Sequence, residues 1–268
     1  MSDVMKKTAL EKEIESVRRK EERYLKKRAE KKVSVINRAL EQRAPEKLQN
    51  TLIAAFSKAF ALIFQKGTAV IEKTYSGDKI KKDVKVREYA AAIWGDRRSL
   101  REFSNQAGKV KRKSLLVTGA EGIGLGVFGV GLPDIPLFTA VLLRSIYETA
   151  LQFGYSYETE QERRFILLLI QGALSYGDEL IAVNAKADEY LENNVLTEET
   201  FASQMDAAAA ALAKELLYMK FLQGIPVAGA VGGAYDVVCL KKILDYVQLK
   251  YKKRFLTDRN RLSERDAD

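Results

Sequence analysis

The amino-acid sequence predicts an all-α fold, on the basis of two observations. A sustained alternation of apolar and polar residues, which half-buried strands show, is nearly absent from the 268 residues. Signals that begin helices recur along the chain, as in the capping sequence Thr159-Glu160-Gln161-Glu162. Hydrophobic residues make up 47% of the chain, which is enough for a sizeable core. We therefore expect a compact multi-helix bundle with two paired glycine-rich helical segments and an exposed charged N-terminal helix.

The N-terminal region, residues 1–44, is predicted to be a charged helical arm. Residues 5–32 are rich in Glu, Lys and Arg, and their apolar residues are too sparse for a coiled-coil seam. Such a pattern is typical of a solvent-exposed, partly frayed helix, and the alternative is a helix that docks on the bundle. Pro45 then separates this arm from the main domain, residues 45–256.

The first half of the main domain is predicted to contain two long helices. The first spans about residues 46–75 and is apolar on nearly every face between residues 51 and 64. Such a helix is either buried on all sides or half sunk in another apolar medium. Gly77 and Asp78 mark a turn, and a further helix over residues 84–104 contains Trp94 and a break at Gly95.

Capping residues and glycines divide the second half of the domain into further helices. One helix is predicted after the N-cap Asp134, with Pro136 in its first turn and Gly154 at its C-terminal end. A second helix begins after the N-cap Thr159. A third, after the N-cap Thr197, covers residues 198–217, and a fourth covers residues 235–255. Residues 257–268 are polar, and we expect them to be a disordered tail.

Two apolar, glycine-rich stretches, residues 119–136 and 224–236, distinguish this chain. Small residues recur four positions apart in each, so that they share one helix face and allow close approach of a neighbouring backbone. One interpretation is a tight helix crossing in a protein core, and the other is a hairpin that partly enters a bilayer. The residues that we expect to pack in this way are Gly122, Gly126, Gly129, Gly131, Pro133, Pro136, Pro226, Gly229, Gly232 and Gly233.

A dinucleotide-binding interpretation of the first stretch is disfavoured. Gly124, Gly126 and Gly129 match the GxGxxG spacing. That motif requires a strand before it and a continuing helix after it. Pro133 and Pro136 follow instead, and no second strand is evident. We therefore expect no cofactor.

A polar cluster is predicted from Asp134, Arg144, Glu148 and Asp236. Arg144 and Glu148 lie four residues apart on an otherwise apolar helix, where an ion pair would fix the helix register. The alternative is a contact site for a headgroup or a protein partner. Glu121 and Asp178 could add carboxylates for a cation or a hydrolase, but nothing fixes their spacing, so we predict no metal site.

The charge is distributed unevenly along the chain, whose formal net charge is +9. Residues 79–113 contain twelve Lys or Arg against four Asp or Glu, and residues 155–206 contain three against eleven. Two basic clusters flank the glycine-rich stretches and resemble the basic collars that attract anionic lipid. The alternative is an ordinary solvated face, and both interpretations require the clusters to be exposed. Because no nucleic-acid recognition motif accompanies them, we expect no nucleic-acid partner. The clusters are Lys109, Lys111, Arg112 and Lys113, and Lys250, Lys252, Lys253 and Arg254.

The composition excludes several classes of protein. The chain has no histidine and one cysteine, which makes catalytic triads, zinc hydrolysis and disulfide frameworks improbable. The first residues lack the apolar run of a secretory signal. The longest apolar runs are shorter than the roughly 20 residues that span a bilayer. We therefore expect a cytoplasmic protein that can attach to the inner face of the cell membrane.

Several motifs in order are similar to the signature of the EcsC family. They are residues 131–136 (GLPDIP), 142–144 (LLR), Glu148, 153–155 (FGY), 225–234 (IPVAGAVGGA) and 251–256 with Tyr251, Arg254 and Phe255. The resemblance covers about residues 85–256 and leaves residues 1–44 outside. The family is named for a bacterial gene beside an ABC exporter. The resemblance therefore implies an accessory protein of transport or the envelope, and it brings no established catalytic residues.

These observations lead to one expected function and two alternatives. We expect a non-enzymatic protein that docks on the cytoplasmic membrane face, through anionic lipid, or on an ABC transporter. The glycine-rich segments would pack or insert, and the basic clusters would supply electrostatic attachment. The first alternative is a soluble helical interaction module. The second is a hydrolase that uses Glu121, Asp134 and Asp178. The oligomeric state does not follow from the sequence.

Overall fold

The computed structural model describes residues 7–29, 46–67, 75–125, 134–196, 199–222 and 232–265. Over these ranges the chain forms nine α-helices and one π-helical turn, and no strand. The elements are α1 (Ala9–Ala29), α3 (Glu46–Leu62), η1 (Ile63–Gly67), α5 (Gly77–Trp94), α6 (Arg97–Leu125), α7 (Asp134–Gln152), α8 (Glu160–Leu174), α9 (Gly177–Asn193), α10 (Phe201–Leu222) and α11 (Gly232–Arg265). The predicted all-α fold class is confirmed.

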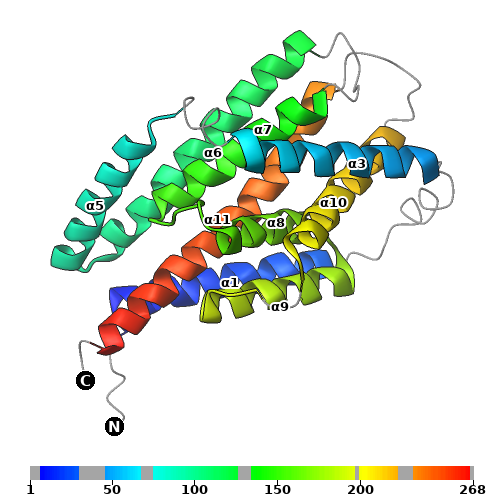
Figure 1. The fold of residues 1–268 in the computed structure, drawn as a ribbon. Coiled ribbons are helices and arrows are strands. Elements are labelled where there is room, and N and C mark those ends of the chain that lie inside the picture. Colours follow the sequence, from blue (N-terminus) through cyan, green and yellow to red (C-terminus); the bar gives the residue numbers. More distant parts are fainter. Residues whose placement is uncertain are drawn as a thin grey trace.

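The bundle is organised around α11, which crosses its whole length (Figure 1). α11 packs against α6, α8, α1 and α7, while α10 packs against α3 and α8. Aromatic pairs join these helices, since the ring centroids of Phe103 and Phe255 are 4.3 Å apart. α5 lies at the edge of the bundle and packs against α6 and α7.

Backbone signals in the sequence explain where several helices begin and end. The Thr159 side chain accepts a hydrogen bond from the backbone N–H of Glu162, which confirms it as the N-cap of α8. Gly95 and Gly154 have φ of 56° and 88°, which glycine adopts readily, so α5 and α7 end there as predicted. Gly172 allows a close approach inside the core, because a Cβ atom there would lie 2.9 Å from Tyr246 Cε1.

The helix boundaries differ from the sequence predictions in the first half of the domain. The helix expected over residues 46–75 ends at Leu62 and continues as a π-helical turn to Gly67. The break expected at Gly95 within residues 84–104 is present and separates α5 from α6, but α5 begins earlier than expected, at Gly77, and α6 continues to Leu125.

The disordered tail predicted for residues 257–268 is wrong for residues 257–265, where α11 continues to Arg265. Contacts to the segment between α7 and α8 and to α9 hold this extension. The Tyr155 hydroxyl donates to Asp258 over 2.7 Å, and Arg261 donates to the Leu191 carbonyl over 3.3 Å. Asn260 also bonds Glu264 within the helix over 2.7 Å. A polar segment is therefore ordered by partners far away in the sequence.

The N-terminal helix α1 has one exposed face and one packed face. Most of its charged residues are exposed or half-buried, as the exposed helix of the prediction requires. Glu13, Val17 and Glu21, four residues apart, are buried against α11, α9 and α6. The alternative of a helix that docks on the bundle therefore describes α1 better than a fully solvated arm.

Candidate functional site

A basic stripe on α6 is the part of the predicted attachment surface that is exposed. Lys109, Arg112 and Lys113 are exposed on this helix. Lys111 points elsewhere and forms an ion pair with Asp245 of α11 at 2.7 Å. One turn beyond Lys113, the side chain of Leu116 is 74% exposed. The surface of α6 therefore presents three cations beside an apolar side chain.

About half of the residues of the two glycine-rich stretches lie outside the described ranges. Residues 119–125, with Gly122, continue α6, and Gly232 and Gly233 begin α11. Pro136 is exposed in the first turn of α7. The C-terminus of α6 and the N-termini of α7 and α11 lie at the same end of the bundle (Figure 1). The packing residues that fall outside the described ranges are Gly126, Gly129, Gly131, Pro133, Pro226 and Gly229.

The structure brings together two members of the predicted polar cluster. Arg144 Nε donates to Glu148 Oε1 over 2.9 Å, and Glu148 is buried. This confirms the predicted pairing within α7. Asp236 lies half-buried in the first turns of α11. Asp134 begins α7, and its side chain is outside the description.

The second predicted basic cluster is not an exposed surface. Lys250, Lys252 and Arg254 are buried, and Lys253 is half-buried. The prediction of an exposed cluster at residues 250–254 is therefore wrong. The physical reason is that α1, α8 and α9 supply carboxylates to these four cations, so the cations can leave water as ion pairs.

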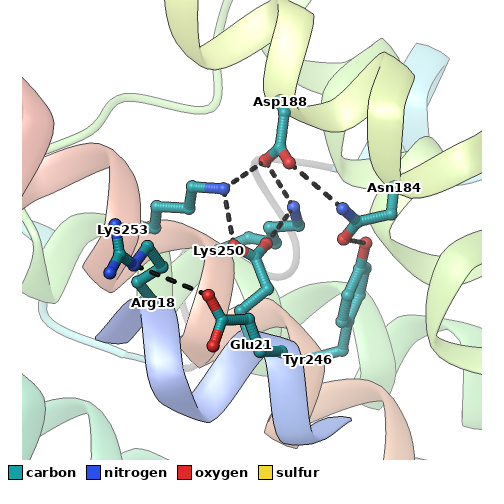
Figure 2. A network of polar contacts seen from close by, with 8 residues as sticks. Arg18, Glu21, Asn184, Asp188, Tyr246, Lys250 and Lys253 are labelled. Carbon is teal, nitrogen blue, oxygen red and sulfur yellow. Dashed lines mark hydrogen bonds and ion pairs between the residues drawn. The ribbon is translucent and has the colours of Figure 1, made fainter. Parts of the chain in front are cut away.

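The first of these ion-pair networks joins α11 to α1 and α9 (Figure 2). Lys250, with 0% of its side chain exposed, binds Glu21 at 2.5 Å and Asp188 at 2.6 Å. Lys253 binds the same two carboxylates at 2.5 and 2.9 Å. Asn184 donates to Asp188 and accepts from the Tyr246 hydroxyl. Two lysines thus face two carboxylates, which balances the buried charge.

Burial also shifts the pKa values of two members of this network, Lys250 and Tyr246. Burial lowers the pKa of Lys250 from its ordinary value, while the carboxylates of Glu21 and Asp188 oppose this by favouring the charged form. Tyr246 has its pKa raised, because burial disfavours the phenolate.

The second network surrounds Glu13 of α1, whose side chain is 1% exposed. Glu13 accepts from Lys252, Arg97 and Arg101, each over 2.8 Å. Burial raises the pKa of this carboxyl, but the hydrogen bonds and charge of Lys252 together with the two arginines outweigh it and hold the pKa at about 2. Glu13 therefore stays ionised and ties α1 to α6 and α11.

The third network centres on Glu162 of α8. Its carboxylate accepts from Tyr190, Tyr251 and Arg254 over 2.9, 2.6 and 2.7 Å. Glu162 occupies the capping-box position after Thr159, yet its side chain turns into the core rather than back to the helix end. The closed capping box is at the start of α1, where Thr8 and Glu11 bond each other's backbone N–H.

Sequence reasoning missed the carboxylates of these networks, namely Glu13, Glu21, Glu162 and Asp188. The spacing of Glu13, Val17 and Glu21 was the available signal, since it places them on one helix face. The networks explain how α1 is held. The carboxylates and lysines of the networks form ion pairs with one another, which is the pattern of charges that stabilise a fold.

Other chemistry has little support among the described residues. No group of three or more His, Cys, Asp or Glu side chains there could hold a metal ion. Asp178 is exposed at the start of α9, whereas the side chains of Glu121 and Asp134 are not described, so the carboxylate-based hydrolase stays an alternative. A hollow of about 20 Å³ beside Arg164 and Glu199 is the size of a single water molecule. Within the described helices, none is long and apolar enough to cross a membrane.

Comparisons with known proteins agree with the sequence resemblance. Residues 8–256 match the EcsC protein family. This match begins within residues 1–44, which the sequence resemblance left outside. A curated relative, Protein EcsC of Bacillus subtilis (strain 168), is 26% identical over 139 residues, or 51% of each chain. Uncharacterized protein YdbA of the same strain is 29% identical over 174 residues, or 62% of each chain. The chain thus spans between half and two thirds of the length of these relatives. No solved structure matches the chain.

Proposed function

The chain belongs to the EcsC protein family, and from this premise we propose that it is a non-enzymatic accessory protein that attaches peripherally to an anionic membrane surface. The single observation that carries the proposal is the exposed stripe of Lys109, Arg112 and Lys113 on α6. These cations lie one turn before the exposed Leu116. A basic stripe beside apolar side chains is the pattern that anionic headgroups attract.

The position of the stripe in the fold supports the same proposal. α6 runs from these cations directly into the first glycine-rich stretch, and α11 begins within the second. The C-terminus of α6 and the N-termini of α7 and α11, which flank the two stretches, lie at the same end of the bundle (Figure 1). Electrostatic attachment through α6 would therefore bring that end of the bundle close to the membrane surface.

Flotation with lipid vesicles tests the proposal. The full chain should float with vesicles of phosphatidylglycerol and phosphatidylcholine at low salt. With vesicles of pure phosphatidylcholine it should remain in the bottom fraction, unbound to lipid. Replacing Lys109, Arg112 and Lys113 by Gln should lower vesicle affinity about a hundredfold at low salt, because each charge near the surface contributes about 1 kcal/mol.

A matched control removes the same charge from elsewhere. Lys12, Lys20 and Lys27 are exposed on α1, so their replacement by Gln leaves the same net charge. This control should keep most of the vesicle affinity. If both triple variants lost vesicle affinity equally, the attachment would depend on net charge alone. That result would contradict a role for the α6 stripe.

A protein receptor is the other mode of attachment, and an ABC transporter is the receptor that the family resemblance suggests. Vesicles made of pure lipid separate the two modes, since they contain no receptor. Binding to native membranes but not to anionic lipid vesicles would replace the lipid surface by a protein partner.

A second candidate function is a soluble helical interaction module. The burial of Lys250, Lys252 and Arg254 favours it, because these side chains are used for internal cohesion and contribute no attachment surface. A chain that remains unbound to anionic vesicles at low salt, and unbound to native membranes, would support this candidate over the first.

A further inference from the structure

The outward face of α5 is apolar over its C-terminal half. Val86, Tyr89 and Ile93 lie at positions i, i+3 and i+7 and therefore share one face of the helix. Their side chains are 68%, 70% and 59% exposed, and Trp94 at the helix end is 71% exposed. A contiguous exposed apolar patch rimmed by polar residues is a mark of an interaction surface.

The opposite face of α5 is the one that the bundle covers. Val84 and Ala91 are its buried residues, and Ile80 is half-buried. The helix packs against α6 and α7 and lies at the edge of the bundle (Figure 1). The stripe of Val86, Tyr89 and Ile93 is thus turned away from the core.

The N-terminal half of the same outward face is mainly cationic. Lys82 precedes Val86 by four residues, and Lys85 precedes Tyr89 by four, so both lie in line with the apolar stripe. Lys79 adds a third exposed lysine. Two exposed acidic residues, Asp78 and Asp83, lie in the same half of the helix, and Asp83 precedes Val86 by three residues. The face therefore carries a net positive charge beside its apolar half.

Resting on the function proposed above, we propose that α5 lies along the surface of an anionic bilayer, with Val86, Tyr89, Ile93 and Trp94 in the interfacial zone. Tyr and Trp are enriched at that depth, because their rings are apolar while their polar atoms stay near water. The lysines of the N-terminal half complement anionic headgroups. This charge complementarity favours lipid over a second copy of the chain, whose α5 would carry the same positive charge.

Fluorescence of Trp94 tests the proposal directly, because it is the single tryptophan of the chain. On addition of phosphatidylglycerol-containing vesicles to the full chain, its emission should move to shorter wavelength, and lipids with brominated acyl chains should quench it. Replacing Val86 and Ile93 by Ser keeps the fluorophore and should lower the vesicle partition coefficient about tenfold, since two partly inserted aliphatic side chains are lost.

Matched controls use exposed aliphatic residues on other helices. Ile181 of α9 and Leu262 of α11 are exposed to a comparable degree, at 52% and 58%. Their replacement by Ser should leave both the partition coefficient and the Trp94 emission change as in the unaltered chain. If the Val86 and Ile93 variant behaves like this control, the proposed role of the α5 face is wrong.

The outcomes separate this inference from the proposed function. Flotation without any change in Trp94 emission would overturn the role of α5 and leave attachment through α6 standing. Absence of both flotation and an emission change would overturn both. A Trp94 change that grows with protein concentration in the absence of lipid would overturn the lipid surface in favour of self-association.

Discussion

Helices α1 and α5 both lie at the edge of the bundle and both carry many charged residues. They differ in the side chains that each turns toward the core. α1 turns the carboxylates of Glu13 and Glu21 inward, where lysines and arginines neutralise them. α5 turns only Val84 and Ala91 fully inward and leaves a stripe of larger apolar side chains exposed. Each helix thus departs from the usual separation of apolar core and charged surface.

The difference shows where each helix has its partners. The buried charges of α1 find opposite charges inside the chain, so they contribute to how the protein holds together. The exposed apolar residues of α5 gain nothing from solvent, so their position points to a partner outside the chain. Substitutions in α1 should therefore change stability, and substitutions on the outward face of α5 should change binding.

The largest expected effect follows from removing Glu21. Glu21→Ala leaves Lys250 and Lys253 with Asp188 as their shared carboxylate, although Lys250 is fully buried. An uncompensated buried charge of this kind costs about 3 kcal/mol, and we expect a loss of that size in the free energy of unfolding. Urea denaturation followed by circular dichroism measures it.

The neighbouring Glu22 is the control for this prediction. Glu22 is exposed and pairs with the exposed Arg18 at 3.5 Å. Exposed ion pairs contribute at most about 1 kcal/mol, so Glu22→Ala should be nearly neutral. Equal effects of the two substitutions would mean that α1 is not held through its inward carboxylates.

A smaller, pH-dependent effect is expected at Glu13. Glu13→Gln should destabilise the protein by about 2 kcal/mol near neutral pH, because Lys252 loses its carboxylate. The folded pKa of about 2 lies below the ordinary 4.5. The stability that Glu13 contributes is therefore complete above about pH 4.5 and is lost as the pH falls toward 2.

The pH dependence distinguishes this contribution from a loss of packing. Urea unfolding of the unaltered chain and of Glu13→Gln, compared from pH 6 downwards, should give a stability difference that shrinks below about pH 4.5. A difference that stays constant over this range would show that the charge of Glu13 is not what binds α1.

The sequence predicted the positions of the helices better than the side-chain contacts between them. The cap at Thr159 and the helix ends at Gly95 and Gly154 follow from local backbone chemistry, and the structure confirms them. The burial of residues 250–254 could not be foreseen, because Glu21 and Glu13 lie 229 and 239 residues away from Lys250 and Lys252. Charge runs are usually solvated, and only tertiary contacts reveal the exceptions.

The same limit applies to the two surfaces proposed for function. The basic stripe of α6 was visible in the sequence as a run of cations, but Lys111 could not be separated from its exposed neighbours without knowing that Asp245 binds it. In α5, apolar residues at helical spacing would ordinarily indicate a buried face. The structure instead buries Val84 and exposes Val86.

The smallest expected effect compares these two valines, which are two residues apart on α5. Val86→Ser should change the free energy of unfolding by less than about 0.5 kcal/mol, because its side chain is already 68% exposed. Val84→Ser removes a buried side chain and buries a hydroxyl, so it should cost about 2 kcal/mol. If urea denaturation showed equal losses for both, the outward face of α5 would be covered within the folded chain. It could then not be the surface that meets a membrane, and the contrast between α1 and α5 would disappear.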